Sequence, residues 1–481
     1  MKYEPTIGLE VHVELDTKSK MFCSCPNNAE EKQANTNVCP ICLGHPGVLP
    51  IINKQALEEA IKVGLALNCK INRQSYFDRK SYFYPDLPKG YQISQKYAPL
   101  CKNGYLEIRG KKIKIHEIHL EEDTCRLSHS LDGKHSYVDC NRAGVPLMEL
   151  VTEPDLKSPQ EAKEFAQELQ LILRYLEVSK ADMEKGQMRI EVNVSLSDKK
   201  NKLGIKVELK NINSFKAVEK GAEYEIKRQE KILEQEGEVV QQTRGWDADK
   251  GITVLQREKE TAHDYRYFPE PDLPLLEFND EYLKRIKSEI PELPNRKKAR
   301  LAQEYHLSQK EADLLVQNET LGNYFEKVIS ELPPGLKPNV LKEMIKLSFN
   351  YLTTDLLGLL DGEIDLGPKF IITPENFAKL MVMLFEKKVS SRIGKDVLSE
   401  MLKTGGGPSQ IVESGGLSQT SNESEIEKII KQVIAENEKP VLDFKAGKDS
   451  ALQFLIGKIM AQSRGKANPE IAQKLLKKYL S

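Results

Sequence analysis

Residues 7–15 alternate strictly between apolar and polar side chains, and such alternation predicts a β-strand with one buried face. Residues 189–196 repeat the pattern. The polar rows of these two segments hold Glu10, His12, Glu14, Arg189 and Glu191. Carboxylates and an imidazole on one sheet face can bind a hard cation such as Mg²⁺ together with nucleotide phosphate. The alternative is the solvated polar face of an antiparallel sheet.

Further acidic residues lie between these two segments. Glu121, Glu122 and Asp123 are consecutive, and Glu149 lies within a short apolar run. Alternation does not decide whether Glu121 or Glu122 faces the polar side, because Glu122 is in phase with the apolar residues before it. Glu149 likewise shares its phase with apolar neighbours. The pattern therefore predicts an acidic cluster without fixing all of its members.

The composition limits the class of protein. A chain of 481 residues allows roughly two to four domains, each with its own core. Charged residues make up 30% of the chain but the net charge is −1, so a nucleic-acid partner needs a local basic patch. No apolar run has the length of a membrane-spanning helix, and the N-terminus lacks the apolar region of a signal peptide. We therefore expect a cytoplasmic protein.

Strand-like segments in adjacent pairs, interrupted by helices, predict an antiparallel α+β domain over residues 1–292. Helix starts are predicted after Asn53, at the capping box that opens with Ser158, and near Ser214.

The rest of the chain is predicted to be helical. We expect an all-helical domain over residues 293–404, a glycine-rich hinge over residues 405–424, and a helical tail domain over residues 425–481. Residues 439–481 contain nine Lys or Arg against three Asp or Glu. Such a basic module after a hinge could bind a tRNA body, and the alternative is a solvated helical bundle.

Four cysteines are spaced as metal ligands in a polar loop over residues 23–42. The set consists of Cys23, Cys25, Cys39 and Cys42. Four thiolates can enclose a tetrahedral Zn²⁺ without leaving an open position, which predicts a structural site. Unligated thiols are the alternative. The other cysteines are expected to be simple thiols, namely Cys69, Cys101, Cys125 and Cys140.

Three further segments could bind a ligand. Residues 82–92 form a rigid aromatic loop that follows Arg79 and Lys80, so it could stack a base or be a plain structural loop. Residues 210–214 enter a helix and could hold phosphate, or simply cap that helix. Residues 264–268 mix charge and aromatic rings, as a domain seam or a ligand clamp would. A glycine-rich phosphate loop is absent, so ATP phosphates would lie on the sheet with metal.

These segments, in this order, resemble the B subunits of the tRNA-dependent aspartyl/glutamyl amidotransferases. The resemblance runs along essentially the whole chain. Its motifs are residues 7–13, 35–37, 86–95, 119–123, 141–144, 149–155, 209–214, 264–269 and 465–469, together with the four-cysteine loop.

The resemblance implies an antiparallel-sheet domain related to glutamine synthetase and guanidino kinases, followed by a helical domain and a mobile tail that engage tRNA. It also implies a heterotrimer in which the A subunit is a glutaminase and the C subunit is small. The substrate would be glutamate or aspartate misattached to tRNA(Gln) or tRNA(Asn). ATP would phosphorylate its side-chain carboxylate, and ammonia from the glutaminase would displace the phosphate.

The resemblance also assigns roles to residues. The implied metal and catalytic residues are Glu10, His12, Glu122, Glu149 and Glu191. Contacts to phosphate or carboxylate are expected from Arg142, Arg189 and Lys210. Glu191 stands where many relatives have Asp, and residues 124–126 read Thr-Cys-Arg where relatives often have Ala-Gly-Lys.

Two other functions are compatible with these residues. A carboxylate cluster beside a basic tail could belong to a metal-dependent phosphodiesterase. The chain could also be a non-catalytic, zinc-containing tRNA-binding adaptor whose acidic residues are only a polar face.

Overall fold

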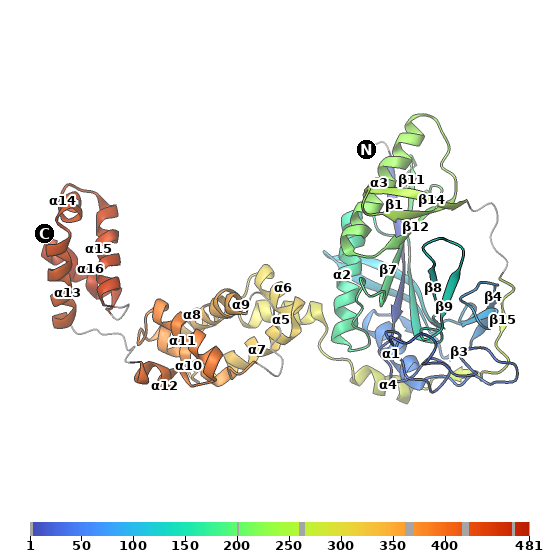
Figure 1. The fold of residues 1–481 in the computed structure, drawn as a ribbon, viewed down its shortest axis with the longest axis horizontal. Helices are drawn as coiled ribbons and strands as arrows, with labels where there is room; N and C mark the ends of the chain where they lie inside the picture. The colour runs from blue at the N-terminus through green and yellow to red at the C-terminus, as the bar shows by residue number, and fades with distance from the viewer. Residues whose placement is uncertain are drawn as a thin grey trace. The chain divides into compact units, whose positions relative to one another are not determined.

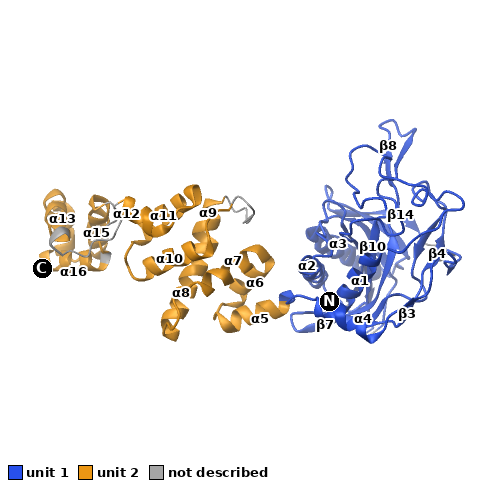
Figure 2. Ribbon diagram, turned by 90° about the horizontal axis from the view of Figure 1, so that it is seen from below, with its two compact units in different colours: residues 1–294 blue, residues 295–481 orange. Residues whose placement is uncertain are grey.

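The computed structural model describes residues 3–199, 202–258, 265–360, 370–415, 423–463 and 467–480. The chain divides into two compact units, residues 1–294 and residues 295–481 (Figure 2). The first unit mixes strands with helices, and the second consists of helices (Figure 1). The predicted α+β class with a helical C-terminal region is therefore confirmed. None of the helices in the described ranges is both long and apolar enough to span a bilayer.

Nine strands of the described part of the first unit form one sheet, in the order β14-β13-β12-β11-β1-β10-β7-β6-β2. Their bounds are β1 (Glu4–Glu14), β2 (Lys70–Ile71), β6 (Cys101–Ile108), β7 (Lys111–Glu122), β10 (Pro146–Thr152), β11 (Met188–Ser197), β12 (Val207–Ile212), β13 (Gln242–Asp247) and β14 (Ile252–Glu258). The first strand of the chain is thus central, between β10 and β11.

One strand pair departs from the predicted antiparallel sheet. Strands β12 and β13 are parallel, with Val207 opposite Gln242. Helix α3 (Phe215–Glu234) connects them and returns the chain to the end from which β12 started, so both strands run the same way. The prediction of a wholly antiparallel sheet is wrong at this pair, and the sheet is mixed.

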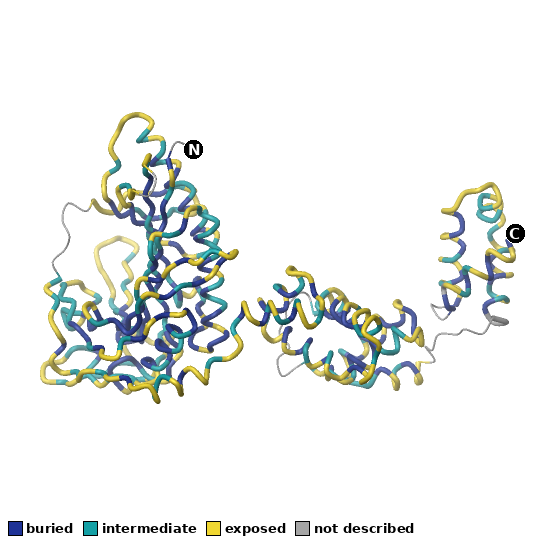
Figure 3. Tube along the Cα trace, turned by 180° about the vertical axis from the view of Figure 1, so that it is seen from behind, coloured by how far each residue is buried: buried dark blue, intermediate teal, exposed yellow. Residues whose placement is uncertain are grey.

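The apolar row of β1 lies at the centre of the core. Ile7, Leu9, Val11 and Val13 are buried there. Helices α1 (Lys54–Ala66), α2 (Pro159–Tyr175) and α3 cover this face of the sheet, and the buried residues follow the strands beneath them (Figures 1 and 3). Burial of each such side chain contributes roughly 1.5–3 kcal/mol. The polar row of β1 therefore faces the other side of the sheet.

Side-chain caps set the starts of these helices. Asn53, Ser158 and Ser214 each accept a hydrogen bond from the backbone amide three residues further on, which confirms the predicted starts. The capping box at Ser158 is incomplete. The Glu161 carboxylate accepts from the Lys157 amide at 2.8 Å, whereas a capping box requires the Ser158 amide.

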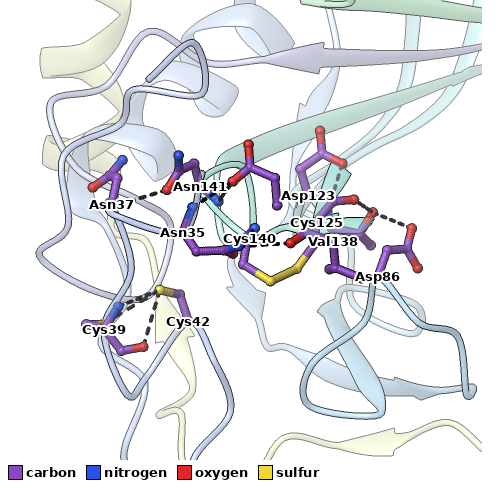
Figure 4. Close-up of a disulfide and its surroundings, with 12 residues drawn as sticks. Asn35, Asn37, Cys39, Cys42, Asp86, Asp123, Cys125, Val138, Cys140 and Asn141 are labelled. Carbon is purple, nitrogen blue, oxygen red and sulfur yellow. Dashed lines mark hydrogen bonds between the residues drawn. A yellow bond between two sulfur atoms is a disulfide. The ribbon is translucent and has the colours of Figure 1, made fainter. Parts of the chain in front are cut away.

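Cys125 and Cys140 form a disulfide at the base of a hairpin (Figure 4). Strands β8 (Arg126–His129) and β9 (Ser136–Asp139) of this hairpin are antiparallel, with Arg126 opposite Asp139. The residues just outside that pair consequently face each other. The expectation of simple thiols at these two positions is wrong for this reason, whereas Cys69 and Cys101 are buried free thiols.

Short strands complete the first unit beside the main sheet. Besides the β8–β9 hairpin, they form two further small sheets. One consists of β15 (Phe268–Pro269), β4 (Asp78–Ser81) and β5 (Tyr91–Ser94), and the other of β16 (Leu276–Glu277) and β3 (Gln74–Ser75). Helix α4 (Asp280–Ser288) packs on α1.

The second unit contains two groups of helices. The first group comprises α5 (Pro294–Glu304), α6 (Gln309–Gln317), α7 (Glu319–Ser330), α8 (Pro338–Asn350), the π-helix η1 (Tyr351–Leu356), α9 (Leu357–Leu359), α10 (Pro374–Phe385), α11 (Ser391–Thr404) and α12 (Pro408–Ser414). The second comprises α13 (Glu423–Glu436), α14 (Glu438–Lys445), α15 (Asp449–Gln462) and α16 (Pro469–Leu480), with a core of its own around Ile430, Leu455 and Leu476.

The segment predicted as a hinge is helical in part. Gly405 adopts the left-handed conformation that ends α11, and α12 follows and contacts both α10 and α11. Residues 416–422 of the predicted hinge lie outside the described residues, as do Arg464, Gly465 and Lys466 of the tail.

Candidate active site and cysteine site

The register of four neighbouring strands brings the acidic residues together on the open face of the sheet. His12 on β1 is opposite Glu149 on β10 and Arg189 on β11. Glu10 is opposite Glu191, and Glu149 is opposite His119 on β7. Side chains directly opposite in adjacent strands are close neighbours. The cluster therefore follows from strand pairing, and none of its members depends on a flexible loop.

The side-chain atoms of this cluster lie close together around His12 and Glu149. His12 Nε2 is 3.4 Å from Glu149 Oε2, 3.6 Å from Glu121 Oε1 and 4.0 Å from Glu10 Oε1. His119 Nε2 is 3.2 Å from the same oxygen of Glu149. Two groups can each hold a metal ion, namely Glu10, His12 and Glu149, and His119, Glu121 and Glu149.

The donor set fits a hard divalent cation. Most of the donors are carboxylate oxygens, which Mg²⁺ prefers. Glu121 Oε2 is buried and has no hydrogen-bond partner among the described residues. An unsatisfied buried carboxylate oxygen is costly, and an ion would satisfy it.

Crowding of charge shifts the pKa values in this cluster. Burial, with the charges of Glu149 and Glu191, raises the pKa of Glu10 to about 7. Burial alone would lower the pKa of His12, but the hydrogen bond with Glu149 and the charges of Glu149 and Glu121 raise it to about 9. The surrounding carboxylates therefore favour a positive charge on His12.

Asp123 joins two arginines at one end of the cluster. Arg142 Nη2 donates to Asp123 Oδ1 at 3.0 Å, and Arg189 Nη1 donates to Oδ2 at 3.0 Å. Nε of Arg142 lies 3.0 Å from Oδ2. Glu14 on β1 adjoins this group, and burial and the charge of Asp123 raise the pKa of Glu14 to about 7. Glu14, Arg126 and Arg142 line a cavity of about 180 Å³ here.

The four cysteines of the loop over residues 23–42 converge on one point. Cys23, Cys25, Cys39 and Cys42 bring their sulfur atoms within 4.8 Å of one another. A hydrogen bond from Cys23, with further help from the Cys39 amide and Lys20, lowers the pKa of Cys42 to about 5. Four convergent thiols, one of which has a lowered pKa that favours the thiolate, fit a tetrahedral metal site. Cys39 and Cys42 lie close to the disulfide in Figure 4.

Comparisons with known proteins cover both units. Residues 5–284 match the family model described as the GatB/GatE catalytic domain, and residues 323–480 match the one described as the GatB domain. The B subunit of the aspartyl/glutamyl-tRNA(Asn/Gln) amidotransferase of Persephonella marina is 47% identical over the whole length of both chains. That of Thermoanaerobacter pseudethanolicus is 48% identical over the same extent. That of Thermotoga maritima is 45% identical and is covered to 99% of its length.

The chain belongs to the family of amidotransferase B subunits. The resemblance inferred from the sequence is thereby confirmed. The proposed kinship of the sheet with glutamine synthetase and guanidino kinases stays a prediction.

In this member of the GatB family, Glu121 rather than Glu122 lies beside His12. Glu122 forms an ion pair with Lys89, and its Oε1 accepts a hydrogen bond from the Ile93 amide at 3.1 Å. The register of β7 with β10 decides between the two residues, because Glu121 is opposite Leu147 on the face that carries Glu149. Met148 and Leu150 are fully buried on the other face, so Glu149 projects toward His12.

Glu191 and Lys210 lie together beside the cluster. Lys210 Nζ is 2.6 Å from Glu191 Oε1 and 3.1 Å from Glu208 Oε1. Glu191 is thus across from Glu10 but already has a cationic partner. The structure places Glu10, His12, Glu149 and Glu191 on one face of the sheet with Arg189 and Lys210, and it places Arg142 beside them. Glu122 lies away from this group.

Lys80 and several tyrosines lie near the same cluster. Lys80 Nζ is 5.2 Å from the ring centre of Tyr265, and Tyr265 packs edge-to-face on Tyr82 and on Tyr267. Burial acts to lower the pKa of Lys80, but the charges of Glu121 and neighbouring groups raise it. Phe83, in the predicted aromatic loop, is 90% exposed. Asp264, which opens the neighbouring motif, lies outside the described residues.

The sequence leaves Glu121 and Glu122 as alternatives, gives Asp123 no separate role within the acidic cluster, and misses His119. His119 and Glu121 share one period-two row of β7, so a search for polar residues two apart in that strand would have found them.

Proposed function

We propose that this chain is the carboxylate-activating subunit of an ATP-dependent carbon–nitrogen ligase. It phosphorylates the side-chain carboxylate of Glu-tRNA(Gln), of Asp-tRNA(Asn) or of both, and the product is then amidated with ammonia derived from glutamine. The observation that carries this proposal is the cluster of Glu10, His12, Glu121 and Glu149 beside two arginines on one sheet face. Membership of the GatB family supports it.

The chemistry has two steps. A carboxylate oxygen of the substrate attacks the γ-phosphorus of ATP, the bond to the bridging oxygen breaks, and ADP leaves. Ammonia then attacks the carbon of the acyl phosphate, loses a proton, and inorganic phosphate leaves with the electron pair of the broken C–O bond. Transfer of this kind depends mainly on positioning and charge neutralisation.

Each group of residues has a task in this scheme. Glu10, His12, Glu121 and Glu149 would hold Mg²⁺, which when bound neutralises phosphate charge. Arg142, Arg189 and Lys210 supply hydrogen-bond donors to phosphate or carboxylate oxygens from fixed positions. Glu191 would adjust the charge around Glu10. The carboxylate of Glu122 is paired with Lys89, so we assign it no metal-binding role.

The other expected components fit the same assignment. A structural Zn²⁺ would be held by the four cysteines of residues 23–42. The glutaminase, as the A subunit, would complete a heterotrimer together with the small C subunit. The basic helices of residues 425–481 would contact tRNA. A cytoplasmic location stays a prediction.

The test reconstitutes the chain with the A and C subunits, Glu-tRNA, glutamine and Mg-ATP. Gln-tRNA and ADP should form together in the wild type. Glu149→Gln should abolish both while tRNA binding persists, because it removes the carboxylate shared by both metal groups.

Other outcomes distinguish the alternatives. Release of tRNA fragments in Mg²⁺ without ATP would identify a phosphodiesterase. Full amidation by Glu149→Gln would leave only a tRNA-binding adaptor role for this chain. The same assay with Asp-tRNA decides which misacylated tRNA is used.

A further inference from the structure

Asp123 is a buried carboxylate that joins three parts of the site. It follows the end of β7, whereas Arg142 belongs to the turn before β10 and Arg189 to β11. The side chain of Asp123 is 4% exposed, and those of Arg142 and Arg189 are 22% and 33% exposed. The carboxylate is therefore shielded from solvent, while both arginine side chains are partly exposed.

The contacts of Asp123 use only part of each guanidinium group. An arginine has five N–H donors in a planar fork. Arg142 donates to Asp123 from one terminal nitrogen, and its Nε lies 3.0 Å from Oδ2 without forming a hydrogen bond. Arg189 donates from one terminal nitrogen. Asp123 does not use the other donors of Arg142 and Arg189, and a phosphate group could accept hydrogen bonds from them.

Charge balance explains why a carboxylate is needed between them. Two guanidinium groups this close repel each other in a half-buried site, and one buried carboxylate compensates one of the two charges. Glu14 on β1 is a second carboxylate beside the two arginines. The group of Asp123, Arg142 and Arg189 adjoins the acidic cluster because Arg189 is directly opposite His12.

The backbone around Asp123 is fixed independently of its side chain. The Asp123 amide donates to Val145 O at 2.9 Å, and the Gly144 amide donates to Asp123 O at 2.9 Å. The disulfide between Cys125 and Cys140 links the same two segments, each two residues from one partner of the ion pair (Figure 4). Loss of the carboxylate should thus release the guanidinium groups without separating the segments.

We propose that Asp123 is a positioning residue that orients Arg142 and Arg189 as a two-arginine receptor for phosphoryl oxygens of the nucleotide. Asp123 itself does not touch the substrate. This inference rests on the function proposed above and adds to it the buried group that sets the direction of its two arginines.

The test compares Asp123→Asn with the wild type in the reconstituted heterotrimer. Asn keeps the shape but loses the charge, so we expect the KM for ATP to rise and kcat/KM for ATP to fall about 100-fold, as a misplacement of about 1 Å can cause. The KM for Glu-tRNA should stay unchanged. Asp123→Glu, which restores a carboxylate, should recover part of the loss, and ADP binding measured by calorimetry should weaken in the Asn variant.

Glu225→Gln is the matched control. Glu225 is also a buried carboxylate between two arginines, since it binds Arg228 at 2.7 Å and lies 3.8 Å from Arg244, but its contacts are on α3 and the adjoining strands. This variant should lower the melting temperature and leave the KM for ATP unchanged. A rise in the KM for ATP equal to that of Asp123→Asn would show a purely structural effect and overturn the proposal.

The outcomes separate this inference from the function on which it rests. If the wild type forms no ADP with Glu-tRNA, the proposed function fails first. If the wild type is active and Asp123→Asn has normal ATP kinetics and ADP binding, only the positioning role is wrong. If Asp123→Asn does not fold, the proposal is tested instead with Arg142→Gln, Arg189→Gln and the double variant. A KM for ATP within twofold of wild type in all three would overturn the proposal.

Discussion

Glu121 Oε1 lies 3.6 Å from His12 Nε2, whereas the neighbouring Glu122 is held by Lys89 on the other side of β7. Adjacent residues of one strand project to opposite faces, so only one of the two can belong to the acidic cluster. The difference makes the two residues a natural pair for comparison.

We expect Glu121→Gln to weaken Mn²⁺ binding, measured by electron paramagnetic resonance with Mn²⁺ in place of Mg²⁺, by at least about tenfold. Loss of a supporting group alone costs about 10–100-fold in metal affinity, and Glu121 lies within the candidate ligand set. Glu122→Gln is the control and should change the affinity less than twofold. Equal weakening by both variants would contradict the placement of Glu121.

The cysteine site should contain one zinc ion per chain, measured by atomic emission. Cys42→Ser should lose it, because Cys42 is the residue with the lowered pKa and so the first to supply a thiolate. Cys69→Ser is the control, since Cys69 is a buried free thiol outside the loop. A zinc content that is unchanged in Cys42→Ser would exclude this site.

Glu59 on α1 should make stability depend on pH. Burial raises its pKa to about 7, and its Oε2 has no hydrogen-bond partner among the described residues. When the pKa of an acid is raised in the folded state, its ionisation lowers the free energy of unfolding. This loss of stability is absent below the unfolded-state pKa near 4.5 and grows as the pH rises to about 7.

Glu59→Gln should therefore be more stable than the wild type at pH 8, by up to about 3 kcal/mol, and equally stable at pH 4. Unfolding of the two proteins by urea, followed across this pH range, measures the difference. A constant difference at every pH would show that ionisation of Glu59 is not its cause.

The disulfide should stabilise the first unit under oxidising conditions. It closes a loop with a sequence separation of 15 residues, which corresponds to roughly 3 kcal/mol in the chain-entropy treatment. Peptide mapping without reductant should recover the fragment that joins Cys125 to Cys140. Reductant should lower the unfolding midpoint of the wild type, and it should have no effect on the double variant Cys125→Ser/Cys140→Ser. A wild type that is indifferent to reductant would contradict the expected stabilisation.

Local patterns in the sequence were sufficient for the elements and for part of the site. The period-two row of β1 predicted which of its residues face the core, and the caps at Asn53, Ser158 and Ser214 predicted three helix starts. Each of these signals lies within a few residues of the feature that it predicts.

The remaining features depend on contacts between distant segments. The register of β7 with β10 decides whether Glu121 or Glu122 faces the acidic cluster. The path of α3 makes β12 and β13 parallel. The β8–β9 hairpin brings together the two cysteines of the disulfide. The alternation of apolar and polar residues within one segment predicts none of these features, because they depend on which strand pairs with it and in which register.

The central position of β1 has a consequence for synthesis of the chain. The two strands that flank β1 end at residues 152 and 197, so β1 leaves the ribosome before either of its neighbours. At about 5–20 residues per second, the interval between the synthesis of β1 and the end of β10 is roughly 7–30 s. During it, the row of Ile7, Leu9, Val11 and Val13 has no partner strand on either side and can pair with another nascent chain. A holding chaperone that binds the first 15 residues would shorten this exposure.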